Sequence, residues 1–194
     1  MRIHKPVRPV GMAEIRREFM EQEPETKTLV FSRDLIRERV REIAKAVSEK
    51  FTGKEPVFIG ILNGAVFFFG DLVRELTIPC RIDFIRAASY GAGTVSSGEI
   101  RFTKDIEIDI AGEPVIVVED IIDTGRTLKR ILRHVEKKGA DPIHVCVLID
   151  KRERREEEVP IDYSGFRVDR GFLVGYGLDC NERFRHLPDI YALD

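Results

Sequence analysis

The residues best suited to chemistry lie directly behind one short apolar run of the chain. Residues 115–118 read V-I-V-V, and behind them come the carboxylates Glu119, Asp120 and Asp123 and then the sequence T-G-R-T at 124–127. The run is mostly β-branched and predicts a buried parallel strand. The helical spacing of apolar residues after the turn predicts a helix. A helix start with hydroxyls and free backbone N–H groups suits a phosphate group.

The neighbouring acidic pair limits what such a phosphate ligand can be. Carboxylates repel phosphate, so a ligand that satisfies both must carry an anion at one end and hydroxyls or a metal ion beside it. A ribose 5-phosphate meets this requirement. The alternative is that the carboxylates are ordinary solvated residues at a strand end, and that Thr124 or Thr127 only caps the helix.

Length and composition bound the class of protein. With 194 residues the chain is long enough for one domain with a real core. The net charge of −2 provides no basic field for nucleic acid, so anion binding must come from local geometry. Cys80, Cys146 and Cys180 lie far apart, which favours reduced thiols over a disulfide framework or a metal cluster. No signal peptide or membrane span is evident, so we expect a cytoplasmic protein without membrane partners.

Apolar patterning predicts strands that alternate with helices. Ser32 is expected to cap a long helix that Gly53 stops. Alternation of this kind indicates the α/β class, with a mostly parallel sheet and helices on both faces. Besides the strand and helix around the T-G-R-T turn, the expected elements are strands over 57–62, 81–88, 99–108 and 143–149 and a helix over 65–76.

The two ends of the chain differ in character from its centre. Residues 1–31 are expected to form a polar N-terminal extension, and residues 32–150 the α/β core. The charge run at 151–158 predicts a solvated loop or helix end. Residues 151–194 are expected to form a small hood over the strand ends, with a short strand at 172–176, and all parts together make one structural domain.

Five motifs in order resemble a known family. Residues 115–127 closely resemble the phosphoribosyl-pyrophosphate (PRPP) signature of the type I phosphoribosyltransferases. Four other stretches resemble the hypoxanthine-guanine branch: Leu62-Asn63-Gly64, Ser89-Tyr90-Gly91, Lys151-Arg152, and residues 172–179 with Asn181-Glu182 and Phe184-Arg185 behind them. The resemblance runs from about residue 32 to the end of the chain. It implies the type I phosphoribosyltransferase-like core with a C-terminal hood.

For PRPP, the resemblance implies that Glu119 and Asp120 bind the ribose hydroxyls directly or through Mg²⁺. Asp123 is implied as the acid or base that handles the proton of purine nitrogen 7. Pyrophosphate is a poor leaving group until its charge is neutralised, so Mg²⁺ is the implied cofactor, with Glu119, Asp120 and Asp179 as its carboxylates. The remaining contacts are implied for Thr124, Gly125, Arg126 and Thr127 with the 5′-phosphate, and for Leu62, Asn63, Gly64 and Arg185 with pyrophosphate.

For the base, Lys151 is the side chain expected to select among purines. Its ammonium has three donors and no acceptor, so it satisfies the carbonyl oxygen of hypoxanthine or guanine and mismatches the amino group of adenine. The resemblance implies that Phe172 stacks on the purine, that the Leu173 backbone bonds the ring edge, and that Asp179 lies near the base. A solvated lysine, a core phenylalanine and a helix-capping aspartate are the plain alternatives.

The loop that begins at Ser89, Tyr90 and Gly91 resembles the mobile lid of the family. A segment rich in glycine and serine can close over a site and exclude water. A strand connection without a catalytic role is the alternative. The commonest family pattern has lysine where this chain has Asn63, which removes one cation from the implied pyrophosphate loop.

The implied activity is purine salvage, in which hypoxanthine or guanine and PRPP give IMP or GMP and pyrophosphate. A xanthine-preferring enzyme and a non-catalytic PRPP-sensing regulator are the alternatives, and the regulator lacks room for a DNA-binding module ahead of the core. P-loop and dinucleotide-binding fingerprints are absent from the sequence. By analogy with the family, a homodimer or homotetramer is expected.

Overall fold

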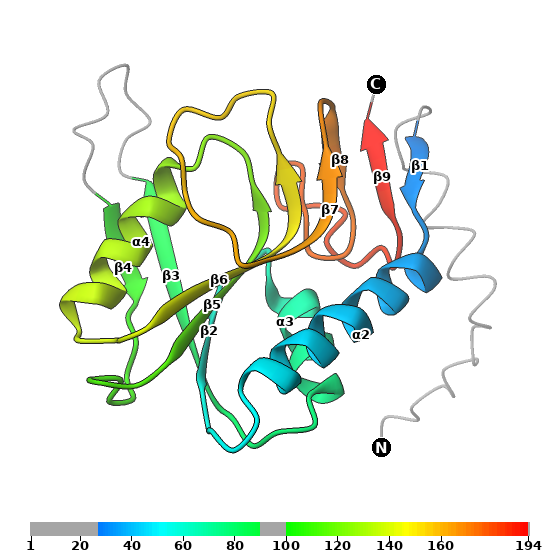
Figure 1. Cartoon of the computed structure of the whole chain (residues 1–194). Coiled ribbons are helices and arrows are strands. Elements are labelled where there is room, and N and C mark those ends of the chain that lie inside the picture. Colours follow the sequence, from blue (N-terminus) through cyan, green and yellow to red (C-terminus); the bar gives the residue numbers. More distant parts are fainter. Residues whose placement is uncertain (1–26, 90–99, 194) are drawn as a thin grey trace, which may run out of the picture.

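The computed structural model describes residues 27–89 and 100–193. A six-stranded sheet forms its centre, and a three-stranded sheet lies beside the strand ends (Figure 1). In spatial order the central strands are β4 (Ile100–Lys104), β3 (Arg81–Ser89), β2 (Val57–Ile61), β5 (Val115–Ile122), β6 (Ile143–Lys151) and β7 (Tyr163–Val168). All neighbours pair in parallel except β3 and β4. The α/β class with a mostly parallel sheet is confirmed.

Three helices cover the two faces of this sheet. They are α2 (Arg33–Lys50), α3 (Val66–Glu75) and α4 (Arg126–Lys137). Ser32 is the N-cap of α2, and its Oγ accepts a hydrogen bond from the Leu35 backbone N–H at 3.3 Å. Gly53, with a φ of 77°, follows the end of this helix. The cap and the stop are therefore where the sequence predicted them.

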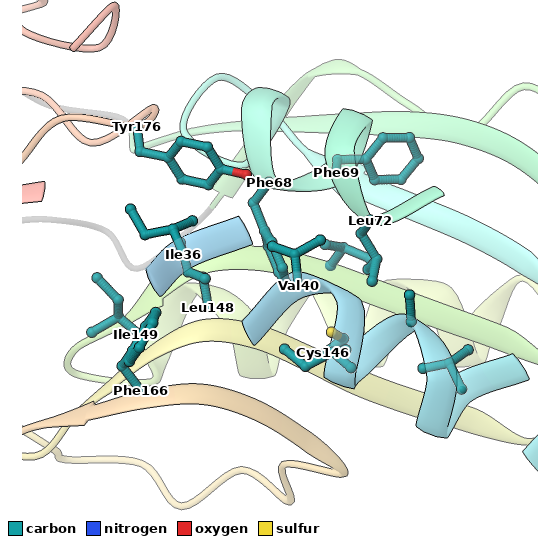
Figure 2. Packing of buried hydrophobic residues seen from close by; sticks show 14 of the residues in the cluster. Ile36, Val40, Phe68, Phe69, Leu72, Cys146, Leu148, Ile149, Phe166 and Tyr176 are labelled. Atoms are coloured by element: carbon teal, nitrogen blue, oxygen red, sulfur yellow. The ribbon is translucent and has the colours of Figure 1, made fainter. Parts of the chain in front are cut away.

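The core is split by the sheet into two apolar layers. On one face, Ile36 and Val40 of α2 and Phe68 and Leu72 of α3 pack against Leu148 of β6 and its neighbours (Figure 2). On the other face, the buried side of α4 packs against the alternate residues of β2, β5 and β6. The three cysteines are free, and Cys146 is buried in the first layer, as a reduced core thiol would be. None of the described helices has the length and apolarity needed to span a membrane.

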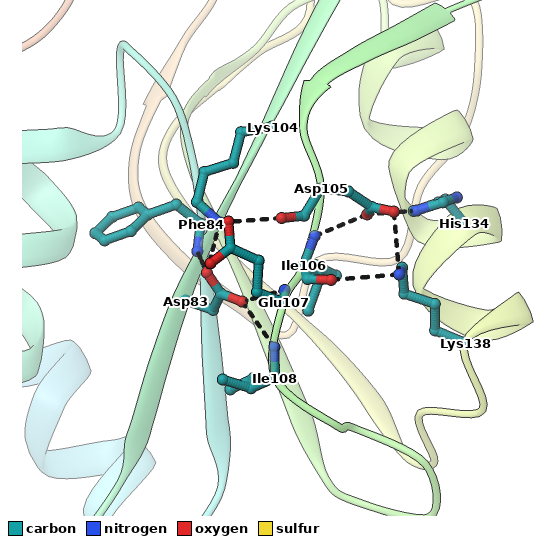
Figure 3. Close-up of polar contacts among 9 residues, drawn as sticks. All are labelled: Asp83, Phe84, Lys104, Asp105, Ile106, Glu107, Ile108, His134 and Lys138. Atoms are coloured by element: carbon teal, nitrogen blue, oxygen red, sulfur yellow. Dashed lines mark hydrogen bonds and ion pairs between the residues drawn. The ribbon is translucent and has the colours of Figure 1, made fainter.

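The segment after β4 is held by a buried carboxylate (Figure 3). Asp83 of β3 accepts hydrogen bonds from the backbone N–H groups of Phe84, Glu107 and Ile108 and from Nζ of Lys104 at 2.8 Å. Burial alone would raise the pKa of Asp83, but these hydrogen bonds lower it below its usual value. Because Asp83 takes the N–H groups of 107 and 108, the strand expected over 99–108 ends at Lys104.

The smaller sheet joins segments from distant parts of the chain. It consists of β1 (Lys27–Phe31), β9 (Ile190–Leu193) and β8 (Phe172–Val174) in that spatial order, all antiparallel. We call it the hood sheet. The last five residues of the expected extension thus belong to the hood sheet, and the sequence analysis missed β1, β7 and β9. Short strands with one exposed face carry little apolar periodicity, which explains these omissions.

Candidate active site

Several of the predicted site residues lie where two neighbouring parallel strands end. Glu119 and Asp120, the acidic pair, lie near the end of β5, and Lys151 is the last residue of β6. The turn 123–127 leads from β5 into α4, and we call it the phosphate turn. In open parallel sheets, ligands bind outside the carboxyl ends of the strands. The fold therefore brings the acidic pair, the phosphate turn and Lys151 to one edge of the sheet.

The acidic pair is buried and short of positive charge. Oε1 of Glu119 accepts the Asp120 backbone N–H at 3.2 Å, and Oδ1 of Asp120 accepts the Ile121 N–H at 2.9 Å. Burial raises the pKa of both carboxyl groups, and the charge of Asp120 raises the pKa of Glu119 further. The guanidinium of Arg185 acts in the opposite direction on Asp120. Two carboxyl groups in this state are stabilised by hydroxyl donors or by a cation.

This donor set fits Mg²⁺ only in part. Buried carboxylate oxygens are the hard ligands that Mg²⁺ prefers, and it usually takes only one or two of them beside water and ligand oxygens. Within residues 27–89 and 100–193, no group of three or more His, Cys, Asp or Glu side chains could hold a metal ion. Asp179 instead forms an ion pair with Nη2 of Arg185 at 2.7 Å and accepts the Glu182 N–H. Glu119 and Asp120 would thus hold the ion together with ligand oxygens.

Two glycines allow the loops around the acidic pair to touch. A Cβ built on Gly64 would lie 1.8 Å from Oδ2 of Asp120, and one on Gly177 would lie 1.9 Å from the Gly64 carbonyl oxygen. Nη1 of Arg185 donates to the Gly177 carbonyl at 2.7 Å. The peptide bond between Leu62 and Asn63 is cis. The implied pyrophosphate residues at 62–64 therefore adjoin the acidic pair, and Arg185 is tied to them through Gly177.

The phosphate turn leaves the start of α4 without a side-chain cap. The N-cap position is Gly125, with a φ of 80°, and no side-chain hydrogen bond caps the helix there. Oγ1 of Thr124 accepts the Arg126 N–H at a long 3.4 Å. Arg126 and Thr127 are exposed. An uncapped helix start with exposed donors is suited to an anion, which favours phosphate binding over the plain capping role.

Asp123 is not a free carboxylate in this structure. Its Oδ2 forms an ion pair with Nη2 of Arg154. Its Oδ1 is buried and has no hydrogen-bond partner among the described residues. The candidate acid or base thus has one oxygen held by a surface arginine and the other available for a proton from a ligand.

The implied base-binding residues divide between a buried and an open part. Lys151 is almost completely buried, and its Nζ lies 3.3 Å from Oε2 of Glu153. Leu173 is buried in the hood sheet, whereas Phe172 is 49% exposed at the start of β8. Of the implied lid, Ser89 ends β3, and Tyr90 and Gly91 lie outside the described residues.

Sequence reasoning missed the role of the charge run. The segment 152–158, which we call the arginine segment, is not a purely solvated loop, because its backbone packs on the phosphate turn. The N–H groups of Glu156 and Glu157 both donate to the Thr124 carbonyl, at 3.0 and 2.9 Å. Lys129 and Arg126 of α4 form ion pairs with Glu157 and Glu156. Alternating charges of this kind look solvated in sequence, and nothing in their spacing indicates a partner 30 residues away.

Comparison with known proteins shows the family of the chain. The sequence model of the family described as phosphoribosyl transferase domain matches residues 32–181. This chain belongs to the phosphoribosyltransferase family. The match covers both the core and the start of the hood, including every implied site residue except Arg185.

Individual members of the phosphoribosyltransferase family are similar to this chain over most of their length. A hypoxanthine-guanine phosphoribosyltransferase of Aquifex aeolicus is 41% identical over 167 residues, which are 86% of this chain and 94% of that protein. A hypoxanthine phosphoribosyltransferase of Salmonella typhimurium is 39% identical over 79% of this chain and 87% of that protein. A crystal structure of a hypoxanthine-guanine phosphoribosyltransferase of Bacillus anthracis superposes with a TM-score of 0.82 at 40% identity, covering 88% of this chain and 100% of the other.

Proposed function

We propose that this phosphoribosyltransferase transfers the 5-phosphoribosyl group of PRPP to hypoxanthine and guanine, forming IMP and GMP in purine salvage. The observation that carries the proposal is the buried acidic pair directly before an uncapped helix start. The carboxylates can accept hydrogen bonds from hydroxyl groups, and the turn can bind a phosphate. They lie only a few residues apart at the end of β5 and so match the two ends of a ribose 5-phosphate.

The chemistry of the transfer follows from the charges around the ribose. Positive charge develops on the sugar ring as pyrophosphate leaves carbon 1, so the barrier is lowered by electrostatics and position. The acidic pair orients the ribose hydroxyls and lies close to that charge. The start of α4 holds the 5′-phosphate. Mg²⁺, held by Glu119 and Asp120 with ligand oxygens, would neutralise the leaving pyrophosphate.

The base is positioned and deprotonated by the neighbouring side chains. The unpartnered Oδ1 of Asp123 takes the proton of purine nitrogen 7 when the new bond forms. The buried ammonium of Lys151 donates to the six-position oxygen and selects 6-oxopurines against adenine. The open face of Phe172 stacks on the ring.

We also propose that copies of the chain associate through α3. Val66 and Phe67 expose large apolar surface on this helix. Adjacent exposed apolar side chains of this kind are suited to contact with a second copy of the chain. Sedimentation of Phe67→Ser should show a smaller assembly than the wild type. Leu29→Ser, at an even more exposed apolar residue of the hood sheet, is the control and should leave the assembly unchanged.

The function is tested by nucleotide formation from hypoxanthine, guanine, xanthine and adenine, with and without PRPP and Mg²⁺. We expect IMP and GMP to form only when both PRPP and Mg²⁺ are present, and adenine to be rejected. A Glu119→Gln/Asp120→Asn variant should remain folded and form no nucleotide. If the wild type makes no nucleotide from either 6-oxopurine, the proposal is wrong.

A further inference from the structure

Arg155 is a buried cation that joins two strand ends of the site. Its side chain is only 5% exposed. Nε donates to the Asp123 carbonyl at 2.9 Å, and Nη2 lies within hydrogen-bond distance of three further acceptors. These acceptors are the Ile122 carbonyl at 3.1 Å, the Lys151 carbonyl at 2.9 Å and Oδ1 of Asp150 at 2.6 Å.

These four acceptors lie where the pairing of β5 and β6 stops. The parallel register between the two strands ends with Ile122 opposite Asp150. Beyond this pair the two strands separate. β5 leads into the phosphate turn, and β6 leads into the arginine segment. The guanidinium of Arg155 bonds both strands at and just past this point. It therefore continues the connection between β5 and β6 where backbone hydrogen bonds no longer do.

A buried guanidinium is not expected here for stability alone. Burial of a charge is unfavourable unless it is paired and hydrogen-bonded, and an ion pair in the interior is weak evidence for stability. Asp150 is its only carboxylate contact within the described chain, and Arg152 shares that carboxylate through the other oxygen at 2.9 Å. The planar, rigid fork of arginine is instead suited to fixing several acceptors relative to one another.

The joined strand ends carry the two side chains proposed to read the purine. Oxygen 6 and nitrogen 7 lie on the same edge of a 6-oxopurine, and the ring is rigid. Lys151 and Asp123 must therefore stand at one fixed separation to bond both atoms together. Arg155 bonds the backbone carbonyl of each of these two residues. Small misplacements at such a site are costly for the reaction.

We propose that Arg155 is a positioning residue that fixes Lys151 relative to Asp123, so that one purine edge meets both side chains. The inference rests on the proposed function, because it takes Lys151 and Asp123 as the base-reading pair. Nη1 of Arg155 is buried without a hydrogen-bond partner among the described residues, and the role proposed here acts through the two backbone carbonyls. Replacement of Arg155 should therefore weaken the binding of ligands that contact both strand ends. It should leave unchanged the binding of a ligand that contacts only β5 and the phosphate turn.

The test compares Arg155→Gln with Arg152→Gln, which serves as the matched control. Both variants take one guanidinium from Asp150, but only Arg155 reaches the carbonyls of β5. The dissociation constants of IMP and of ribose 5-phosphate are measured for each variant, with kcat and KM for hypoxanthine. In Arg155→Gln, IMP binding and kcat/KM should fall by about tenfold or more, as for loss of charge-assisted hydrogen bonds. Ribose 5-phosphate binding should stay within about threefold of the wild type in both variants.

A second variant covers the case in which Arg155→Gln does not fold. Arg155→Lys retains the charge beside Asp150, but a compact ammonium on a flexible stem cannot hold all four acceptors in place. It should show the same selective loss of IMP binding with the fold intact. A rescue of IMP binding by lysine to the wild-type level overturns the inference, because charge alone would then suffice.

The outcomes separate the inference from the proposed function. If the wild type binds no IMP, the proposed function fails and takes this inference with it. If the wild type binds IMP but Arg155→Gln and Arg152→Gln weaken it equally, the positioning role is wrong while the function stands. The positioning role is also wrong if ribose 5-phosphate binding falls as much as IMP binding, since Arg155 would then only support the fold of the turn.

Discussion

Gly125 of the phosphate turn lies against the arginine segment, and its replacement tests whether the contact between the two segments matters. Its φ is 80°, and a Cβ built on it would lie 2.3 Å from the carbonyl oxygen of Glu157. Gly53, after α2, has nearly the same φ of 77° but nothing within 4 Å of its built Cβ. Gly53→Ala is therefore a matched control in which the backbone strain is present and the collision is absent.

The magnitude follows from these two geometries. A left-handed conformation costs a residue with a Cβ about 1 kcal/mol, and both alanine variants incur this cost. In Gly125→Ala the Glu157 carbonyl must also move out to at least 3.0 Å. That shift strains the hydrogen bonds from the N–H groups of Glu156 and Glu157 to Thr124, each worth about 1 kcal/mol. We expect Gly125→Ala to lose about 3 kcal/mol of unfolding free energy, and Gly53→Ala about 1 kcal/mol.

Urea denaturation of the wild type and both variants measures these losses. KM for PRPP is measured in parallel, because the same contact holds the turn that is proposed to bind the 5′-phosphate. We expect KM to rise in Gly125→Ala and to stay unchanged in Gly53→Ala. Equal losses of stability in the two variants, with wild-type KM in both, would refute the claim that the arginine segment braces the phosphate turn.

Three further changes probe the site itself. Asp123→Asn should lower kcat by roughly 10- to 10⁴-fold while PRPP binding is largely kept, as steady-state and binding assays can show. Lys151→Gln should relax the rejection of adenine or raise KM for 6-oxopurines, since an amide offers an acceptor as well as donors. Burial keeps the pKa of Glu119 well above its usual value, so the folded chain retains a proton that the unfolded chain has released. Stability should therefore fall as pH rises from the usual carboxyl range through the raised pKa. In urea titrations Glu119→Gln should reduce this fall, leaving the part due to Asp120, and should be about 1 kcal/mol more stable than the wild type at neutral pH.

Each of these expectations has a contrary result. Full turnover in Asp123→Asn removes that carboxylate from the mechanism. Unchanged selectivity and KM in Lys151→Gln remove the donor argument for base choice. The prediction for Glu119 is wrong if the free energy of unfolding of the wild type rises between pH 5 and neutral pH and Glu119→Gln is no more stable. The burial of the acidic pair would then not destabilise the fold.

The parts of this structure that sequence could predict are those with a local physical signal. Ser32 caps its helix because a hydroxyl accepts a nearby N–H group, and residues 115–118 form a strand because β-branched apolar residues fit a buried sheet. The acidic pair and the phosphate turn are contiguous in the chain, so their proximity needed no knowledge of the fold.

The parts that sequence could not predict depend on contacts between distant residues. Asp83 ends β4 by accepting N–H groups more than 20 residues away. Arg155 and Arg154 look alike in a run of charges, yet one is buried against β5 and the other forms an exposed ion pair with Asp123. The packing of the arginine segment decides which of the two arginines is buried. The periodicity of the sequence contains no signal for this packing.

The order of strands in the hood sheet sets the order in which the site can be assembled. Among the described strands, β8, which begins with Phe172, pairs only with β9, and β9 in turn joins it to β1. A nascent polypeptide in which residues 190–193 are still inside the ribosome can already pair the strands of the central sheet, the last of which ends at Val168. It still lacks β9, the strand with which β8 and its residue Phe172 pair. The part of the site that holds Phe172 is thus completed last, when β9 has emerged and paired with β8.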